Sequence, residues 1–103
     1  MGQVYVRIFR DKRYVMVAAC DRNVLGRTLR EGRVKLEVAD RFYGGDLCSV
    51  EETMQALEVA DVGNLVGGEV IKAAVQRGLV DPAAIMKIGG VPHVQIVRIG
   101  RLH

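Results

Sequence analysis

His93 stands in the stretch "IGGVPHVQ" at 88–95, and its imidazole can exchange a proton or a hydrogen bond near neutral pH. The neighbouring Gly89 and Gly90 would let a ligand approach the main chain closely. Strand alternation would also place His93 and Gln95 on one face, next to that loop. The same residues suit a tight turn that feeds a final strand, because glycine relaxes the backbone and a nearby proline fixes φ. Both interpretations, a recognition patch and a structural turn, stay open.

A second candidate is "RFYGGD" at 41–46, where Phe42 and Tyr43 could stack on a planar ligand while Arg41 pairs with a phosphate. The alternative places Phe42 in the core and Tyr43 at its edge with a hydrogen-bonded hydroxyl. If the 41–46 and 89–93 loops meet, they form one small-molecule pocket around His93. The candidate ligand-binding residues are Arg41, Tyr43, Gly44, Asp46, Gly89, Gly90, His93 and Gln95.

Aromatic and basic side chains interleave on two expected strands. Tyr5, Arg7 and Phe9 share one face of the first strand, and Arg33 and Lys35 share one face of another. Such a surface resembles in its chemistry a sheet that stacks and neutralises single-stranded RNA. Solvated sheet faces also carry these residue types as cross-strand pairs, so the pattern alone does not establish RNA binding.

Catalysis has weaker support. Cys20 or Cys48 could act as a nucleophile with His93, and Asp21 or Asp46 could orient the imidazole, but nothing in the sequence brings these groups together. No two metal ligands stand at the close spacing of a metal site, and neither glycine pair fits a nucleotide-binding motif. We therefore expect no metal and no cofactor, and whether the protein is an enzyme stays open.

Charge is unevenly distributed along the chain. Residues 1–41 hold ten basic and five acidic residues, residues 42–81 hold two and seven, and residues 82–103 hold three and none. If the two terminal segments meet, they form a basic surface that could steer a polyanion. Alternatively, the charges of the basic and acidic segments could simply compensate each other. A protein-interaction domain that uses an acidic helical face is a further alternative, with Glu51, Glu58, Asp61 and Glu69.

The 103 residues suit a single compact domain spanning 1–103. No apolar run approaches the roughly 20 residues that cross a bilayer, so we expect no membrane association and a cytoplasmic location. The sequence does not decide between a monomer and a homodimer.

Hydrophobic periodicity predicts the elements that would position these residues. Expected strands lie at 3–9, 14–20, 33–38, 84–88 and 91–99, and expected helices lie at 50–60 and 66–77. Between them, the pattern predicts an irregular turn at 21–32 that ends at Gly32, a loop at 41–49 and a break at 61–64. Ser49 and Glu52 have the spacing of a capping box, and Gly78 suits a left-handed helix end. The order β-β-β-α-α-β-β predicts an α+β fold, a mainly antiparallel sheet with both helices packed on one face.

Several short motifs recur in a fixed order: "CD" at 20–21, "LG" at 25–26, "RFYGGDL" at 41–47, "NLVG" at 64–67, "GLVDP" at 78–82 and "IGGVPHVQ" at 88–95. In order and spacing they resemble the small archaeal family called domain of unknown function 424. The resemblance covers nearly the whole chain. It implies an archaeal, cytoplasmic protein with one compact domain, and it transfers no catalytic residue.

The leading hypothesis is a non-enzymatic module that binds RNA or a ribonucleoprotein through Tyr5, Arg7, Phe9, Arg33 and Lys35. The pocket around His93 and the acidic helical face remain as alternatives.

Overall fold

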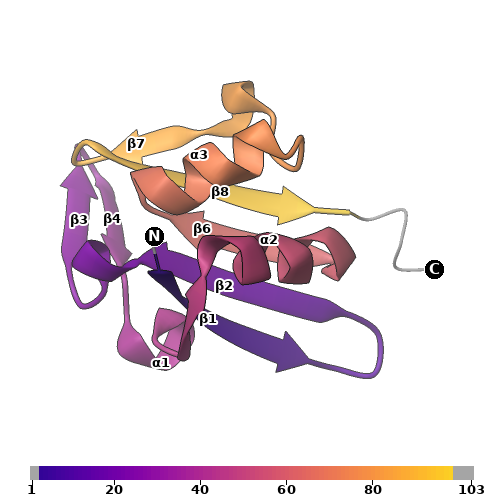
Figure 1. The fold of residues 1–103 in the computed structure, drawn as a ribbon. Coiled ribbons are helices and arrows are strands. Elements are labelled where there is room, and N and C mark those ends of the chain that lie inside the picture. Colours follow the sequence, from indigo (N-terminus) through magenta and orange to yellow (C-terminus); the bar gives the residue numbers. More distant parts are fainter. Residues whose placement is uncertain (1–2, 99–103) are drawn as a thin grey trace.

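A six-stranded sheet forms the centre of the computed structural model, which describes residues 3–98 (Figure 1). Its strands follow the spatial order β5 (Asp46–Ser49), β1 (Gln3–Arg10), β2 (Val15–Asp21), β6 (Val62–Val66), β8 (Val91–Val97) and β7 (Met86–Ile88). Strands β2 and β6 run parallel, and the other neighbours are antiparallel. The α+β class with a mainly antiparallel sheet is therefore confirmed.

The longer helices α2 (Val50–Val59) and α3 (Gly68–Gln76) cover one face of this sheet, as predicted (Figure 1). The other face packs against a separate hairpin and a short helix: β3 (Thr28–Glu31), β4 (Val34–Glu37) and α1 (Asp40–Tyr43). Two 3-10 turns, η1 (Arg22–Val24) and η2 (Pro82–Ala84), complete the described elements. Within residues 3–98, no helix is both long and apolar enough to cross a membrane.

Alternation along β2 divides the core into two layers. Val17 and Ala19 point towards the helices, and Ala18 and Cys20 point towards the hairpin and α1. The helix-side layer includes Val4, Met54, Leu57, Leu65, Val70 and Ala74, and the hairpin-side layer includes Leu29, Val38, Tyr43, Val66 and Ile88. Because both faces of β2 are buried, this strand is continuously apolar and not alternating.

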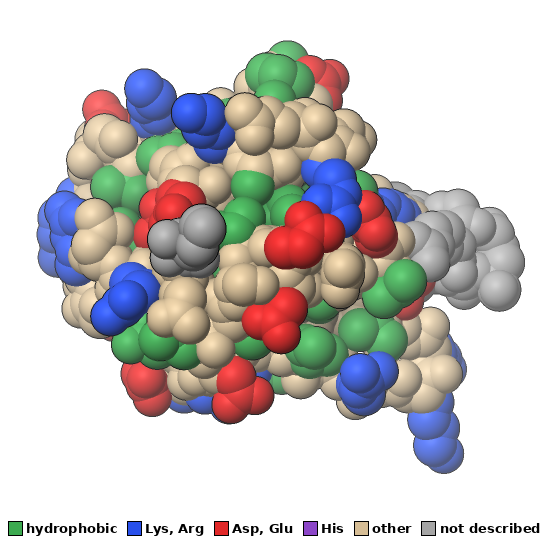
Figure 2. All heavy atoms as spheres, in the orientation of Figure 1, with side chains coloured by type: hydrophobic (Ala, Val, Ile, Leu, Met, Phe, Trp, Pro, Cys, Tyr) green, Lys and Arg blue, Asp and Glu red, His purple; other side chains and the backbone are tan. Residues whose placement is uncertain are grey.

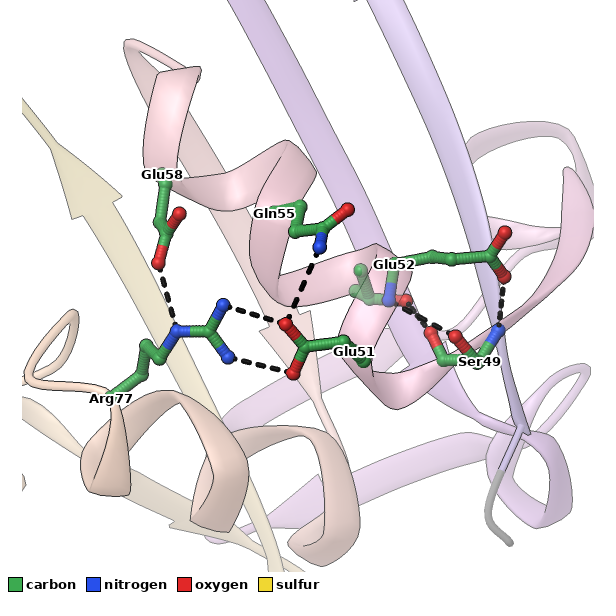
Figure 3. Close-up of polar contacts among 7 residues, drawn as sticks. Ser49, Glu51, Glu52, Gln55, Glu58 and Arg77 are labelled. Carbon is green, nitrogen blue, oxygen red and sulfur yellow. Dashed lines mark hydrogen bonds and ion pairs between the residues drawn. The ribbon is translucent and has the colours of Figure 1, made fainter.

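The predicted capping box starts α2. The Glu52 backbone N–H donates to Ser49 Oγ at 3.0 Å, and the Ser49 backbone N–H donates to Glu52 Oε1 at 2.9 Å (Figure 3). Gly78 has a φ of 77° directly after the last turn of α3, as a left-handed helix end requires. Both helix boundaries therefore follow from local sequence.

Arg77 ties the end of α3 to α2. Its guanidinium donates to both carboxylate oxygens of Glu51, at 2.8 and 2.9 Å, and to Glu58 at 2.8 Å (Figure 3). These hydrogen bonds lower the pKa of the Glu51 carboxyl and raise the pKa of Arg77. The groups are exposed, so screening by water keeps the contribution to stability small.

Three strands correct the predicted element order. Residues 28–31 form β3, where the sequence suggested an irregular turn, and residues 46–49 form β5 inside a predicted loop. Residues 62–66, which span most of the expected break at 61–64 and the start of the expected second helix, form β6 in the interior of the sheet. The predicted last strand extended to residue 99, which lies outside the described residues, and β8 ends at Val97.

Candidate functional site

Three polar side chains from separate elements meet on the hairpin side of the sheet. The Tyr43 hydroxyl, from α1, donates to Asn64 Oδ1 on β6. His93 Nε2, on β8, lies 3.2 Å from the same oxygen. The neighbouring strand position beside Asn64 is Ala18, and this small residue lies in the same buried cluster as Tyr43. Asn64 therefore links α1 to β8 through one oxygen atom.

The surroundings of this oxygen fix the hydrogen positions. Tyr43 is only 2% exposed, so its O–H group needs a protein acceptor, which is Asn64 Oδ1 and not the amide nitrogen. His93 must then donate from Nε2, which leaves a lone pair on Nδ1. Burial lowers the pKa of His93 and raises the pKa of Tyr43, so both rings are neutral at physiological pH.

Two atoms of this network have no protein partner within the described residues. Asn64 Nδ2 and His93 Nδ1 form no hydrogen bond there, and neither is fully buried, so both retain contact with solvent. Gln95 is exposed directly opposite Asn64, and Met86 is 53% exposed directly opposite His93. We call Asn64, Met86, His93 and Gln95 the amide–imidazole patch. It presents donors, an acceptor and an apolar surface together.

Gly89 and Gly90 form the turn between β7 and β8. Both have positive φ, 59° and 82°, which suits a two-residue hairpin loop of the I′ type. The Gly89 backbone N–H donates to Glu31 Oε1 at 2.9 Å, which ties the tip of the β3–β4 hairpin to this turn. The contacts of the glycine pair are those of a structural turn.

The pocket predicted from the 41–46 and 89–93 loops is divided in the structure. Tyr43 meets His93 through Asn64, but Asp46 pairs with Val6 at the far edge of the sheet, with β1, β2 and β6 between Asp46 and β8. Gly45 packs closely against β1, because a Cβ there would lie 2.0 Å from the Val6 carbonyl oxygen. The separation of Asp46 from His93 follows from the strand order.

Asp46 instead borders a depression of about 290 Å³ between β1 and β5, lined by Val6, Arg7, Ile8, Gly45, Asp46 and Cys48. Arg41 is exposed on α1. Neither residue contributes to the amide–imidazole patch.

The sheet face that was expected to bind RNA carries Tyr5, Arg7 and Phe9, which have packing partners in the structure. The Arg7 guanidinium donates to the carbonyl oxygens of Gly44, at 2.9 Å, and Asp40, at 3.3 Å. The Phe9 ring stacks on Phe42 with centroids 5.3 Å apart. Tyr5 is likewise partly buried against the hairpin-side core. Arg7 and Phe9 thus hold α1 against the sheet, so the three residues do not form an open stacking surface.

Arg33 and Lys35 belong to the separate hairpin and do not share the sheet of Tyr5, Arg7 and Phe9. Residues 22–35 carry one acidic residue and five exposed cations, which we call the basic arm: Arg22, Arg27, Arg30, Arg33 and Lys35. In Figure 2, basic side chains occur at the left margin, where Figure 1 places β3 and β4, and acidic ones lie over the helices.

Two alternatives use residues that already have structural contacts. Cys20 is fully buried, and burial beside Asp21 raises the pKa of its thiol to about 12, so it is a poor nucleophile. Of the acidic helical face, Glu51 and Glu58 bind Arg77, and Asp61 accepts a hydrogen bond from the Val15 backbone. Within residues 3–98, no cluster of three potential ligands could hold a metal ion.

The architecture defines a small α+β protein with two helices on one face of a mixed sheet and a basic hairpin on the other. The chain belongs to the family described as "Protein of unknown function (DUF424)", whose model matches residues 9–99. It is also similar to an uncharacterized conserved protein from Methanopyrus kandleri, whose crystal structure superposes with a TM-score of 0.77 at 26% identity, covering 92% of this chain and 90% of that chain. The family resemblance and its archaeal affiliation are thereby confirmed. Among curated proteins, none matches the chain.

Proposed function

We propose that the protein is a non-enzymatic module that binds RNA, free or within a ribonucleoprotein, through the basic arm. The observation that carries the proposal is a cross-strand pair of like charges. Arg30 lies directly opposite Lys35 in the hairpin, and both side chains are exposed. Like charges in this position destabilise a hairpin, and a bound phosphate between them would relieve the repulsion.

The surroundings of this pair support a phosphate ligand. Arg33 follows Gly32 in the two-residue hairpin loop, so a third cation stands at the tip of the same hairpin. The acidic residue of the arm, Glu31, is engaged by the Gly89 backbone. Lys35 lies 3.8 Å from Glu37, an exposed contact that contributes little and that a phosphate could replace. Cys20 and Cys48 are both free thiols, as is usual in proteins of a reducing compartment.

The test is the affinity for a single-stranded RNA, measured by fluorescence anisotropy over a range of salt concentrations. The affinity should fall as salt rises, with a logarithmic slope of about −0.7 for each phosphate contacted. The double variant Arg30→Glu with Lys35→Glu should weaken binding and flatten the slope.

A matched control makes the same change in net charge at the opposite end of the molecule. Lys12→Glu with Arg13→Glu alters exposed residues in the β1–β2 turn, which Figure 1 places far from the hairpin. This variant should retain most of the affinity. Equal losses in the two variants, or no RNA binding by the wild-type protein at low salt, would overturn the proposal. Arg30→Glu alone restores opposite charges across the hairpin, so it should not lower thermal stability.

A further inference from the structure

We propose that the amide–imidazole patch binds an unpaired nucleobase. The inference deepens the proposed function, because it assigns a base-recognition site to the RNA whose phosphates the basic arm would hold. It rests on the atoms that the Tyr43–Asn64–His93 network leaves available.

The available atoms match the edge of a base. Asn64 Nδ2 offers N–H donors, and His93 Nδ1 offers an acceptor lone pair in the Nε2–H tautomer. A base edge presents the complementary arrangement, as in adenine, whose N7 acceptor lies next to the N6 amino donor. In the major-groove edge of guanine, N7 and O6 are both acceptors, so O6 would face the His93 lone pair. The patch should therefore favour adenine over guanine along this edge.

The donor of Asn64 is fixed before any ligand arrives. An amide that rotated freely would offer either oxygen or nitrogen, but rotation here would deprive the buried Tyr43 hydroxyl of its acceptor. The same oxygen fixes the tautomer of His93. A preorganised site loses less conformational entropy when a ligand binds, so even a ligand with few contacts, such as a single base, can bind to it.

The patch also has a surface for the ring of the base. Met86 is 53% exposed in the cross-strand position opposite His93, and a thioether contacts aromatic rings favourably. Gln95 adds an exposed amide opposite Asn64. Recognition of RNA bases commonly combines such ring contacts with hydrogen bonds to base edges.

The hairpin that carries most of the basic arm contacts strand β7, which contributes Met86 to the amide–imidazole patch. Met86 lies on β7, and the turn that follows β7 is bound to the hairpin by the Gly89–Glu31 hydrogen bond. The β3 and β4 strands both contact β7. A strand of RNA held by the hairpin would therefore have its bases near the patch.

The test uses free nucleosides, which lack phosphate and so bind independently of the basic arm. Adenosine and guanosine are titrated against isotope-labelled protein while the side-chain N–H₂ signals of Asn64 and Gln95 and the His93 ring signals are followed by NMR. Adenosine should shift these signals with millimolar affinity, and guanosine should shift them less. His93→Leu removes the Nδ1 acceptor and puts no other acceptor in its place, while Asn64 Oδ1 keeps the Tyr43 hydroxyl as a donor, so adenosine should bind roughly tenfold more weakly.

Two further variants separate this inference from RNA binding by the arm. Gln95→Leu changes an exposed residue without touching the Tyr43–Asn64 contact, and it should also weaken adenosine binding. Arg30→Glu with Lys35→Glu should bind adenosine as the wild-type protein does. The inference fails if adenosine leaves the patch signals unchanged, or if it binds His93→Leu and Gln95→Leu as tightly as the wild type. Either result would leave salt-dependent RNA binding by the arm standing.

Discussion

Asp21 Oδ1 lies 2.9 Å from the backbone nitrogen of Val70, which is 49 residues further along the chain. The second carboxylate oxygen accepts the N–H of Glu69 at 2.8 Å. Asp21 ends β2, and these two N–H groups belong to the first turn of α3, where a helix lacks internal acceptors. A buried carboxylate on the sheet thus caps a helix that has no side-chain cap of its own.

Replacing Asp21 with alanine should lower the free energy of unfolding by about 2–4 kcal/mol, because two donors lose a charged acceptor. Chemical denaturation monitored by circular dichroism measures this loss. The matched control is Asp81→Ala, which removes an exposed carboxylate that caps η2 through the Ala83 N–H. The control should cost about 1 kcal/mol or less. Similar losses in both variants would contradict a special role for Asp21.

Two adjacent glycines make a sharper test of the same junction. Gly67 has a φ of 120°, and a Cβ there would lie 2.3 Å from the Asp21 Cγ atom, whereas a Cβ on Gly68 would meet nothing within 4 Å. Gly67→Ala should therefore destabilise by more than about 2 kcal/mol, since strain and the displaced carboxylate add together. Gly68→Ala should be neutral or should stabilise by up to about 1 kcal/mol, because alanine is the better helix former. A tolerated Gly67→Ala would show that Asp21 can cap α3 from another position.

The two thiols should differ in reactivity. Cys20 is fully buried with a thiol pKa raised to about 12, while Cys48 is partly exposed at the edge of the sheet. In a Cys48→Ser variant, Cys20 should react with a chromogenic disulfide reagent only as fast as the protein opens, and denaturant should accelerate the reaction. In a Cys20→Ala variant, Cys48 should react without prior unfolding. Comparable rates under native conditions would contradict the burial of Cys20.

Local signals explain which elements could be predicted from the sequence. The Ser49–Glu52 box and Gly78 bound the helices through contacts within a few residues, and both predictions were confirmed. The β3–β4 hairpin was only half recognised, because Gly32 was interpreted as a boundary. The glycine is the first residue of a two-residue loop and has a φ of 57°.

Strand β6 was not predicted, because its unusual residues are explained by contacts with residues that are distant in the sequence. Gly63 resembles a loop residue, but a Cβ there would lie 3.0 Å from Leu57 and 3.3 Å from Ile96. Close packing of α2 on the sheet therefore favours a residue without a side chain at this position. Asn64 looks equally out of place in an interior strand, yet its oxygen serves Tyr43 and His93. No periodicity reveals such pairings. Tyr43 and His93 could be chosen as candidates from their residue types and motifs. No local feature of the sequence indicated Asn64, which is hydrogen-bonded to both.

Acidification should destabilise the protein through His93. Burial holds the pKa of this histidine below its ordinary value of 6.5 in the folded state, so between the two values the unfolded chain binds more protons. Stability should therefore be unaffected by His93 above about pH 7 and should fall as the pH drops through 6.5 towards the folded pKa. Protonation of Nδ1 would place a charge in the half-buried space beside Asn64 and Met86.

Urea denaturation of the wild-type protein and of His93→Gln, repeated at several pH values between about 5 and 8, isolates this contribution. Carboxylates titrate in both proteins and cancel in the difference. Glutamine cannot be protonated, so the stability of the wild type relative to the variant should decrease as the pH falls, by about 1.4 kcal/mol for each unit by which folding displaces the pKa. Two curves that stay parallel over the whole range would mean that the imidazole is as well solvated in the folded protein as in the unfolded chain.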